Sequence, residues 1–366
     1  MLRNFSSPEV LYAIAALAFA FLLAYYGTPL VRRLAVLCGC FDSPDGDRKL
    51  HDAPVPYFGG LAILAGLTAA LFLFTYTLTG RIPAEIVMMG AGGFMICLVG
   101  LIDDIYDMRP IAKLLCQVAI ALFTAYYGFT IEYITLFGHT LRLGSLAVPL
   151  TAMWIVVIVN AVNLIDGLDG LAGGITALES FALLITAILM GNPVCAIASA
   201  ALCGAVLGFL PFNFGKATIF MGDAGAMLIG YVMACISVLG LFKAQALFSI
   251  VVPAMIFALP VLDVVDSFFR RLLTGSSPFA ADHKHLHYIL LENGFLPAQS
   301  VLALTVAAGI FCVASVIYVR FRLVSIGLFL LGALFLAVLR FDKKLITRFK
   351  KKTVPSGTVH NSKDLL

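Results

Sequence analysis

The chain has 366 residues, of which 61% are apolar, and its mean hydropathy is +1.03. Only 12% of the residues are charged, against about a quarter in a typical soluble domain, and the formal net charge is +4. This composition excludes a soluble globular protein and indicates a chain that crosses a membrane many times.

Apolar runs of about 20 residues, the length that crosses a bilayer, predict eleven membrane-spanning helices. They begin near residues 8, 58, 84, 110, 145, 171, 193, 218, 246, 299 and 322. We therefore predict an all-α polytopic membrane protein, with one multi-span domain over residues 1–340 and a basic cytoplasmic tail over 341–366. The eight cysteines lack Cys-x-x-Cys spacing, which argues against zinc and disulfide roles.

The loops between these spans alternate between the two sides of the membrane, and their charges are unequal. One side carries 18 of the 24 Lys and Arg residues and all fifteen Asp residues, whereas four of the five Glu residues lie elsewhere. The positive-inside rule makes the side that is rich in Lys and Arg cytoplasmic. That rule does not explain the Asp residues, so a cytoplasmic face dense in Asp suggests a site for divalent cations and phosphates.

The first cytoplasmic loop contains Arg48-Lys49 and leads to Gly59-Gly60 at the start of the second span. A solvated loop with ordinary positive-inside charges explains these residues on their own. A second reading is that Lys49 provides a mobile cation for phosphate oxygens.

The third span ends in an acidic motif, Asp103-Asp104-x-x-Asp107. These three acids could share one helix face, since residues three and four apart are neighbours on a helix. Neutralisation by Arg109 and Lys113 is one interpretation. A Mg²⁺ site is favoured, because ionisable residues at membrane spans are costly and usually functional.

A polar stretch separates the fifth and sixth spans, with the motif Asn160-x-x-Asn163-x-x-Asp166-Gly-Leu-Asp169-Gly. The glycines let a backbone approach a ligand, and the amides and carboxylates suit a polar or metal-bound substrate. A water-exposed turn or hydrogen bonds between spans would also use such residues. Two Asp-Gly pairs beside an Asn-x-x-Asn pair favour one wall of an active site.

The eighth span begins with Phe220-Met-Gly-Asp223-Ala-Gly. The preceding Gly215-Lys216 is not a P-loop, because the flanking glycine and the Ser or Thr of that motif are absent. An unpaired carboxylate just inside a span is costly, so a metal ion is the partner expected for Asp223. Phe220 could stack on a base, although packing is the common role of Phe in apolar sequence.

The last polar stretch contains Arg270-Arg271 and then three alternating histidines, His283, His285 and His287. A zinc site of the form His-x-His-x-His would need strand geometry and further ligands. Histidines that bind phosphate, by charge or by hydrogen bonds, fit the neighbouring Arg and Lys residues better.

Five of these blocks, spread over residues 45–295, stand in the order that they have in one known family. The blocks are Arg48-Lys49 with Pro56 and Gly59-Gly60, Asp103-Asp104-x-x-Asp107, the Asn160 to Asp169 motif, Phe220-Met-Gly222-Asp223-Ala-Gly225, and Asp282-x-x-His285-Leu-His287. The chain resembles the polyprenyl-phosphate N-acetylhexosamine-1-phosphate transferases, and among them the bacterial undecaprenyl-phosphate N-acetylglucosamine-1-phosphate transferases. Tyr288 replaces the last His of the family's His-x-His-His pattern, which argues against the muramoyl-pentapeptide branch.

The resemblance implies a reaction of UDP-N-acetylglucosamine with undecaprenyl phosphate, which gives undecaprenyl-diphospho-sugar and UMP. Another UDP-N-acetylhexosamine donor is the alternative. The cofactor would be Mg²⁺, with Mn²⁺ as a substitute, and the site would face the cytoplasm at the bacterial inner membrane, where cell-envelope polysaccharide synthesis starts. Membrane lipids are expected partners, nucleic acid is not, and a homodimer is left open.

The resemblance also implies a role for each site residue. Metal ligands would be Asp103, Asp104 and Asp223, of which Asp103 orients the acceptor lipid phosphate. His285 and His287 would join these three acids as catalytic residues that hold phosphate groups. Substrate contacts would come from Lys49, Asn160, Asn163, Asp166, Asp169, Phe220 and Arg271. A transporter is the rival class, but transporters place ionisable residues near the midplane, whereas here they gather at one membrane face.

Overall fold

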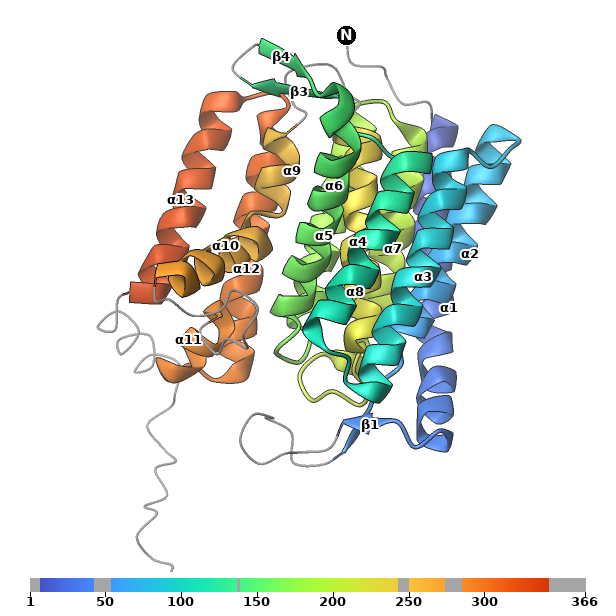
Figure 1. Ribbon diagram of the computed structural model, residues 1–366, viewed down its shortest axis with the longest axis vertical. Helices are drawn as coiled ribbons and strands as arrows, with labels where there is room; N and C mark the ends of the chain where they lie inside the picture. Colours follow the sequence, from blue (N-terminus) through green and yellow to red (C-terminus); the bar gives the residue numbers. More distant parts are fainter. Residues whose placement is uncertain (1–6, 43–53, 137–138, 243–249, 274–284, 342–366) are drawn as a thin grey trace, which may run out of the picture.

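The structure is a computed structural model that describes residues 7–42, 54–136, 139–242, 250–273 and 285–341 (Figure 1). Within these residues almost all regular structure is helical, which confirms the all-α fold. The exceptions are two short antiparallel pairs, β1 (Phe41–Asp42) with β2 (Val55–Pro56) and β3 (Tyr133–Leu136) with β4 (His139–Arg142).

Ten helices of the described residues are long and apolar enough to cross a membrane, which confirms ten of the eleven predicted spans. They are α1 (Ser7–Leu37), α2 (Gly59–Thr79), α3 (Ala84–Tyr106), α4 (Pro110–Tyr127), α5 (Ala147–Ile165), α6 (Leu171–Leu189), α7 (Pro193–Asn213), α8 (Gly222–Ser237), α12 (Pro297–Tyr318) and α13 (Arg322–Phe341).

The ninth predicted span differs from expectation, because the described part of it consists of two shorter helices. These are α9 (Val251–Ile256) and α10 (Ala258–Leu273), and α10 runs obliquely to the long helices (Figure 1). Pro260 lies in the first turn of α10, where a missing backbone N–H leaves no helical hydrogen bond unmade. The proline therefore suits the start of a new helix better than the middle of a long one.

Successive spans run in opposite directions, so the carboxyl ends of α3, α5 and α7 lie at one face of the bundle, together with the start of α8 (Figure 1). We call this face the site face. The short helix α11 (Leu286–Glu292) lies on the same side, whereas the β3–β4 hairpin lies at the opposite face. The polar motifs of the sequence are thus brought to one side of the bundle.

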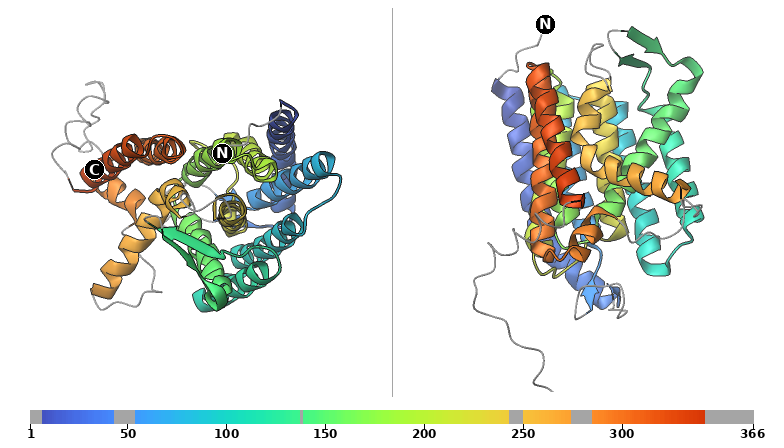
Figure 2. Two further views of the ribbon diagram at one scale, coloured as in Figure 1. Left: turned by 90° about the horizontal axis from the view of Figure 1, so that it is seen from above. Right: turned by 90° about the vertical axis from the view of Figure 1, so that its left-hand side faces the viewer.

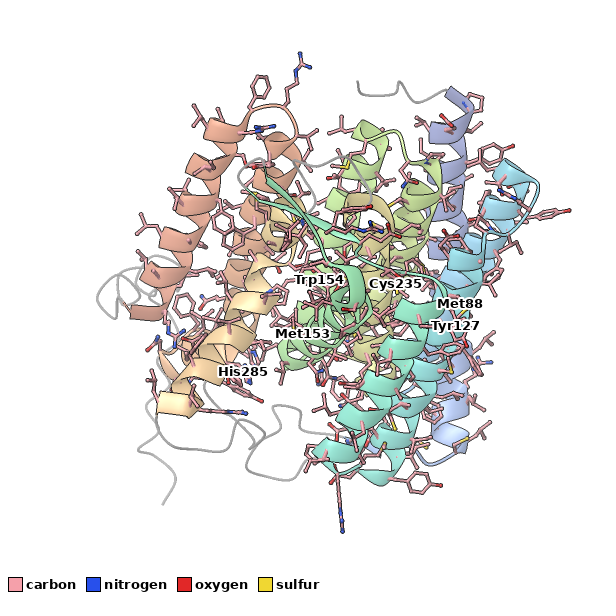
Figure 3. The ribbon with its side chains drawn as sticks, turned by 45° about the horizontal axis from the view of Figure 1, so that its top comes forward. Met88, Tyr127, Met153, Trp154, Cys235 and His285 are labelled. Carbon is pink, nitrogen blue, oxygen red and sulfur yellow. The ribbon has the colours of Figure 1, made fainter. Side chains whose placement is uncertain are left out.

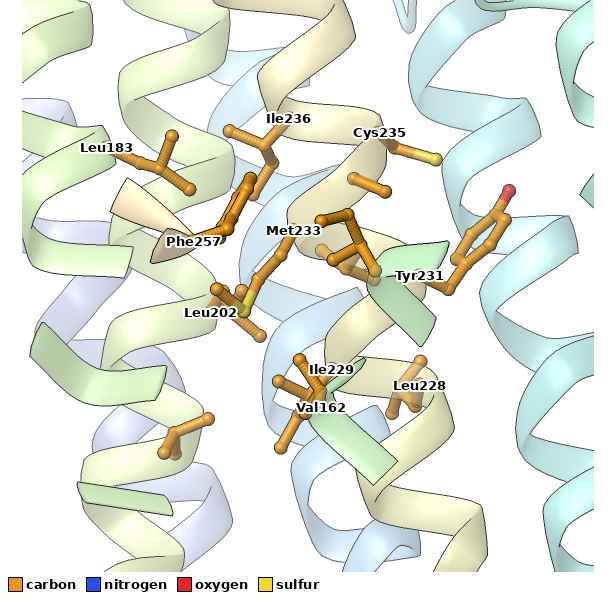
Figure 4. Packing of buried hydrophobic residues seen from close by; sticks show 14 of the residues in the cluster. Val162, Leu183, Leu202, Leu228, Ile229, Tyr231, Met233, Cys235, Ile236 and Phe257 are labelled. Atoms are coloured by element: carbon orange, nitrogen blue, oxygen red, sulfur yellow. The ribbon is translucent and has the colours of Figure 1, made fainter. Parts of the chain in front are cut away.

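Helix α8 stands at the centre of the bundle, where it packs against α2, α3 and α5 and is seen end-on in Figure 2. In the most apolar 18-residue stretch of α8, 89% of the residues are buried inside the protein, compared with 17% in α13 at the periphery. Side chains on several sides of α8 meet neighbouring helices, for example Ile229 near Val162 of α5 and Met233 near Leu202 of α7 (Figure 4). The position of α8 therefore fixes where Asp223, at its first turn, is placed.

Buried polar side chains on α8 find partners on the helices around it. The Tyr231 hydroxyl group donates to the Met88 carbonyl oxygen of α3 at 3.2 Å. The Trp154 indole of α5 donates to the Ser237 hydroxyl oxygen at 3.0 Å, and Figure 3 shows Trp154 and Met88 near α8. Such bonds hold α8 in register with α3 and α5, because an unpaired polar group in the membrane interior is costly.

Glycines let α2 and α8 touch through their backbones at the site face. A Cβ atom on Gly60 would overlap the backbone of Gly225. The Gly60 amide donates to the Met221 carbonyl oxygen at 3.0 Å, and the Gly59 amide donates to the Phe220 carbonyl oxygen at 3.0 Å. The Gly59-Gly60 pair thus anchors the segment that leads into α8.

Candidate active site

The centre of the candidate site is the ammonium group of Lys113, near the start of α4. Its Nζ atom lies 2.6 Å from Oδ2 of Asp223 and 2.8 Å from Oδ2 of Asp103. The same atom lies 3.4 Å from Oδ1 of Asn163, whose Nδ2 group donates to Oδ1 of Asp223. Side chains from α3, α4, α5 and α8 therefore converge on one point at the site face.

Asp103 and Asp223, the two acids of this cluster, differ in how far their side chains are exposed to solvent. Asp103 is 9% exposed, and its second oxygen accepts the Met108 amide at 2.8 Å, which fixes the end of α3. The side chain of Asp223 is 32% exposed. Asp223 is therefore the carboxylate of the pair that a substrate can reach more easily.

Asp104 faces the start of α8. Its Oδ1 atom accepts the Asp223 amide at 2.8 Å, and Oδ2 accepts the Ala224 amide at 3.2 Å. Gly222 has a φ of 69°, and a Cβ atom there would overlap the Asp104 carboxylate. Asp104 thus binds the first amides of α8, which favour a negative charge.

The expectation that three acids share one face of α3 is wrong for Asp107. This residue follows the last residue of α3, has a φ of 50° and is exposed. It caps the end of α3, because its amide donates to the Asp103 carbonyl oxygen at 2.9 Å. Lys113 forms an ion pair with Asp103, as predicted by the hypothesis that basic residues neutralise the acids of this motif. It also forms an ion pair with Asp223.

The stretch from Asn160 to Gly170 forms the end of α5 and the turn into α6. Asn160 donates to Oε1 of Gln117 at 2.7 Å, a bond between α5 and α4 that fits the reading of contacts between spans. Asp169 accepts the Ala217 amide at 2.9 Å and so ties the turn to the loop before α8. Asn163 is the member of this stretch that hydrogen-bonds to the Lys113 cluster.

Asp166 lies in the same turn, outside the spans, and is partly buried. Burial raises the pKa of Asp166 to about 8, and the negative charges of Asp223 and Asp104 add to this effect. The carboxyl group therefore binds a proton more readily than an ordinary aspartate does, and when it is protonated it can donate a hydrogen bond as well as accept one.

His285 and His287 lie at the start of α11. Nδ1 of His285 is 2.9 Å from Oδ2 of Asp263, and both side chains are almost fully buried. The His287 ring lies parallel to the His285 ring, with ring centroids 6.0 Å apart. A Cβ atom on Gly167 would overlap Nε2 of His287, so this ring contacts the turn that contains Asp166.

Burial also lowers the pKa of His287, to about 4, so its imidazole is neutral near pH 7. Its Nε2 atom is buried and has no hydrogen-bond partner among the residues that the structure describes. A buried polar nitrogen without a partner is unfavourable unless a ligand or water completes it.

Three further site residues have weaker structural support. Phe220 and Arg271 are partly exposed, on the segment before α8 and in the last turn of α10. Lys49 lies outside the described residues, as do Asp282 and His283. Their assignments stay predictions.

Comparison with known proteins places the chain in a family. A family model described as glycosyl transferase family 4 matches residues 86–241, a range that holds three of the five motifs. A probable undecaprenyl-phosphate N-acetylglucosaminyl 1-phosphate transferase of Bacillus subtilis is 34% identical over 292 residues, which are 79% of this chain and 80% of the relative. This chain belongs to glycosyl transferase family 4.

Other relatives of the family cover similar lengths. A decaprenyl-phosphate N-acetylglucosaminephosphotransferase of Mycobacterium tuberculosis is 33% identical over 351 residues, or 87% of this chain and 85% of the relative. An undecaprenyl-phosphate alpha-N-acetylglucosaminyl 1-phosphate transferase of Yersinia pestis is 28% identical over 366 residues, or 94% and 96%. Membership of the family confirms the resemblance that the five motifs indicated.

Members of family 4 are generally metal-dependent, and the cluster around Lys113 suits a divalent cation. Among the described residues, no three His, Cys, Asp or Glu side chains are grouped so that they could hold a metal ion by themselves. Mg²⁺ needs only one or two carboxylates, because water and substrate phosphates supply its other ligands. Asp103 and Asp223 already share one cation, the Lys113 ammonium, so this pair of carboxylates fits the requirement.

Two residues with contacts at or beside the candidate site are not predicted by the sequence motifs. The motifs predict only a neutralising charge for Lys113 and no role for Asp263. One signal was present for each, since a Lys one turn into an apolar span and an Asp among Val and Leu are both costly in a membrane. Their partners lie up to 110 residues away, which no local pattern reveals.

Proposed function

We propose that this protein transfers N-acetylglucosamine 1-phosphate from UDP-N-acetylglucosamine to undecaprenyl phosphate. The observation that carries the proposal is the convergence of Lys113, Asp103, Asn163 and Asp223 from four helices at one membrane face. The names of the relatives support the sugar donor, and they include both undecaprenyl and decaprenyl acceptors. The coarser activity is that of a polyprenyl-phosphate N-acetylglucosamine-1-phosphate transferase.

In the reaction, a phosphate oxygen of the lipid attacks the sugar-bearing phosphorus of the donor. The bond from that phosphorus to the bridging oxygen breaks, and UMP leaves with the electron pair. The second pKa of a phosphate monoester is about 6, so the nucleophile is already mostly ionised at pH 7 and needs little base catalysis. Positioning and neutralisation of charge are therefore the main tasks of the protein.

Asp223 and Asp103 are the proposed Mg²⁺ ligands, with Mn²⁺ as a substitute, and the bound ion would neutralise diphosphate charge. Lys113 lies between these carboxylates and would contact phosphate oxygens once the substrate draws its ammonium group away from them. Asp104 positions Asp223 through the first amides of α8. Both oxygens of Asp104 accept backbone N–H groups in the substrate-free protein. A direct contact of Asp104 with Mg²⁺ is a further part of the proposal.

The nucleotide would lie along the turn between α5 and α6. Asn163, Asp166 and Asp169 provide the polar groups of this wall, and Asp166 can donate a hydrogen bond while it is protonated. Asn160 supports the wall through α4. Phe220 is the proposed stacking partner of the uracil ring, and Lys49, Arg271, His285 and His287 are the proposed phosphate contacts.

The site face is proposed to be cytoplasmic, at the inner membrane of a bacterium. The support is the count of 18 out of 24 Lys and Arg residues on that side, which the positive-inside rule places in the cytoplasm. A cytoplasmic site would receive UDP-sugars directly. The product would begin the synthesis of a cell-envelope polysaccharide such as O-antigen, common antigen or the teichoic acid linkage.

The test is transfer of radiolabel from UDP-[³H]GlcNAc into butanol-extractable undecaprenyl lipid by the purified protein, with Mg²⁺ or with EDTA. UDP-GalNAc is run in parallel, because it is the alternative donor class. We expect Mg²⁺-dependent labelling that added UMP reverses, and its loss in Asp223→Asn. Arg320→Gln is the matched control, since it removes an exposed charge at the opposite face. Absence of labelling from UDP-GlcNAc would refute the proposal, and labelling from UDP-GalNAc alone would favour the alternative donor.

A further inference from the structure

An acidic residue that the proposed reaction does not use lies on α10. Asp263 is 2% exposed and sits among apolar residues of that helix. One carboxylate oxygen, Oδ1, accepts the Leu286 amide at 2.9 Å, and the other, Oδ2, lies 2.9 Å from Nδ1 of His285. A single buried carboxylate thus holds both a ring and the backbone at the start of α11.

The chemistry of these contacts defines the state of the histidine. Oδ1 of Asp263 accepts the Leu286 N–H group, and when Oδ2 also acts as an acceptor, Nδ1 of His285 carries the proton between the two side chains. The ring nitrogen left for any other group is then Nε2. Hydrogen bonds of this kind, from a histidine to a buried carboxylate, set both the tautomer and the orientation of the ring.

The fixed ring in turn determines where the next histidine lies. The planes of the His285 and His287 rings differ by 6°. Nε2 of His287 contacts Gly167, in the turn between α5 and α6, and has no hydrogen-bond partner among the described residues. Figure 3 shows His285 at the lower side of the bundle, beside α10. Asp263 thereby connects α10 to the turn that carries Asp166.

We propose that Asp263 is a positioning residue of the transferase, which orients His285 through a hydrogen bond from Nδ1–H to its carboxylate and seats the His285–His287 segment against the Asp166–Asp169 turn. This inference rests on the proposed function, because the segment matters only if substrate phosphates or nucleotide lie beside that turn. Asp263 does not contact substrate itself. It acts through the two histidines.

The substitution Asp263→Asn tests this role with almost no change in side-chain size. The amide oxygen can still accept the Leu286 N–H group, but the amide NH₂ group then faces Nδ1 of His285 and must donate to it. The proton of the ring is thereby moved to Nε2. We expect kcat to fall about 10- to 100-fold, the usual cost of losing such a supporting bond, with a change of less than about threefold in KM for UDP-GlcNAc.

Asp266→Asn is the matched control, because Asp266 lies one turn further along α10 and pairs with Arg270 and Arg340 at 2.6 and 2.8 Å. It disturbs α10 without touching either histidine. If Asp263→Asn lowers kcat only as much as Asp266→Asn does, Asp263 is merely structural and the proposal is wrong.

The tautomer is read directly from ¹⁵N spectra of histidine-labelled protein in nanodiscs, with His285→Gln to assign the resonance. We expect a proton on Nδ1 in the wild type and on Nε2 in Asp263→Asn. Finding Nδ1 of His285 without a proton in the wild type would overturn the proposal, even if Asp263→Asn failed to fold. A wild type with the expected tautomer but no lipid labelling would instead refute the proposed function.

Discussion

Lys113 of α4 lies between two carboxylates of two other helices, with Nζ 2.6 Å from Asp223 and 2.8 Å from Asp103. The bridge is largely shielded from solvent, because the Lys113 side chain is only 15% exposed. The positive charge of this one ammonium group reduces the repulsion between the carboxylates of Asp103 and Asp223, which meet where α3 and α8 adjoin.

Replacement of this ammonium group, as in Lys113→Met, should lower both activity and stability. We expect a fall of about 100-fold or more in turnover, as for the loss of one charge-stabilising donor, and a loss of about 2 kcal/mol in unfolding free energy. Lipid labelling and thermal unfolding in detergent measure the two effects. Lys216→Met is the control, since Lys216 is exposed on the loop before α8. Equal effects of the two substitutions would contradict a central role for Lys113.

Asp104 should stabilise the start of α8 through its two backbone contacts. Asp104→Ala removes both acceptors and should cost about 1 to 2 kcal/mol, as the loss of a helix cap does. Asp104→Asn keeps one acceptor, so it should unfold at a temperature between those of the wild type and Asp104→Ala. An Asn variant as unstable as the Ala variant would show that the carboxylate does not act as a cap.

Gly60 should not tolerate a side chain, because a Cβ atom there would overlap the backbone of Gly225. Neither backbone can move aside as a flexible side chain would, so Gly60→Ala must separate α2 from α8 and displace Asp223. We expect loss of lipid labelling and a lower unfolding temperature. Gly327→Ala on α13 is the matched control, since no heavy atom lies within 4 Å of the position that a Cβ atom would take there. Wild-type activity of Gly60→Ala would contradict this packing.

His287 should make the protein less stable as the pH falls. The pKa of His287 is about 4 in the folded protein, against 6.5 for its ordinary value, so only the unfolded chain gains a proton between these values. The unfolded state then binds more protons, and unfolding free energy falls as pH decreases from 6.5 toward 4, by at most about 3 kcal/mol. Thermal unfolding at pH 7 and pH 5 measures this loss. His287→Gln should show a smaller loss, and an unchanged pH dependence would remove His287 as its cause.

Much of this fold could be predicted from the sequence, because a helix that crosses a bilayer needs an apolar run of about 20 residues. Ten spans begin where the apolar runs begin, and Asp103, Asp104 and Asp223 stood out because charge is rare at membrane spans. The break between α9 and α10 was missed, because an apolar run reads the same whether one helix or two pass through it.

The pairing of the acids could not be predicted by the same means. Asp104 meets the Asp223 amide across 119 residues of sequence, and Asp263 meets His285 across 22. Motifs identify which residues carry chemistry, but long-range packing decides whether an acid faces a metal ion, a helix end or a histidine. Asp104 is an example, since the contacts of its carboxylate with the first amides of α8 could not be predicted from the motif.

The burial of α8 has a consequence for the order in which the protein matures. During synthesis α8 leaves the ribosome after α1 to α7, yet its place is between α2, α3 and α5, not at the edge of the bundle. The contacts of α8 with α2, α3 and α5 can form only after these earlier helices and α8 have all been synthesised, and Asp223 meets Lys113 only once α8 is in place. A nascent chain that ends before Gly222 thus has the acids of α3 and the lysine of α4, but it lacks Asp223, the residue that joins them at the candidate site.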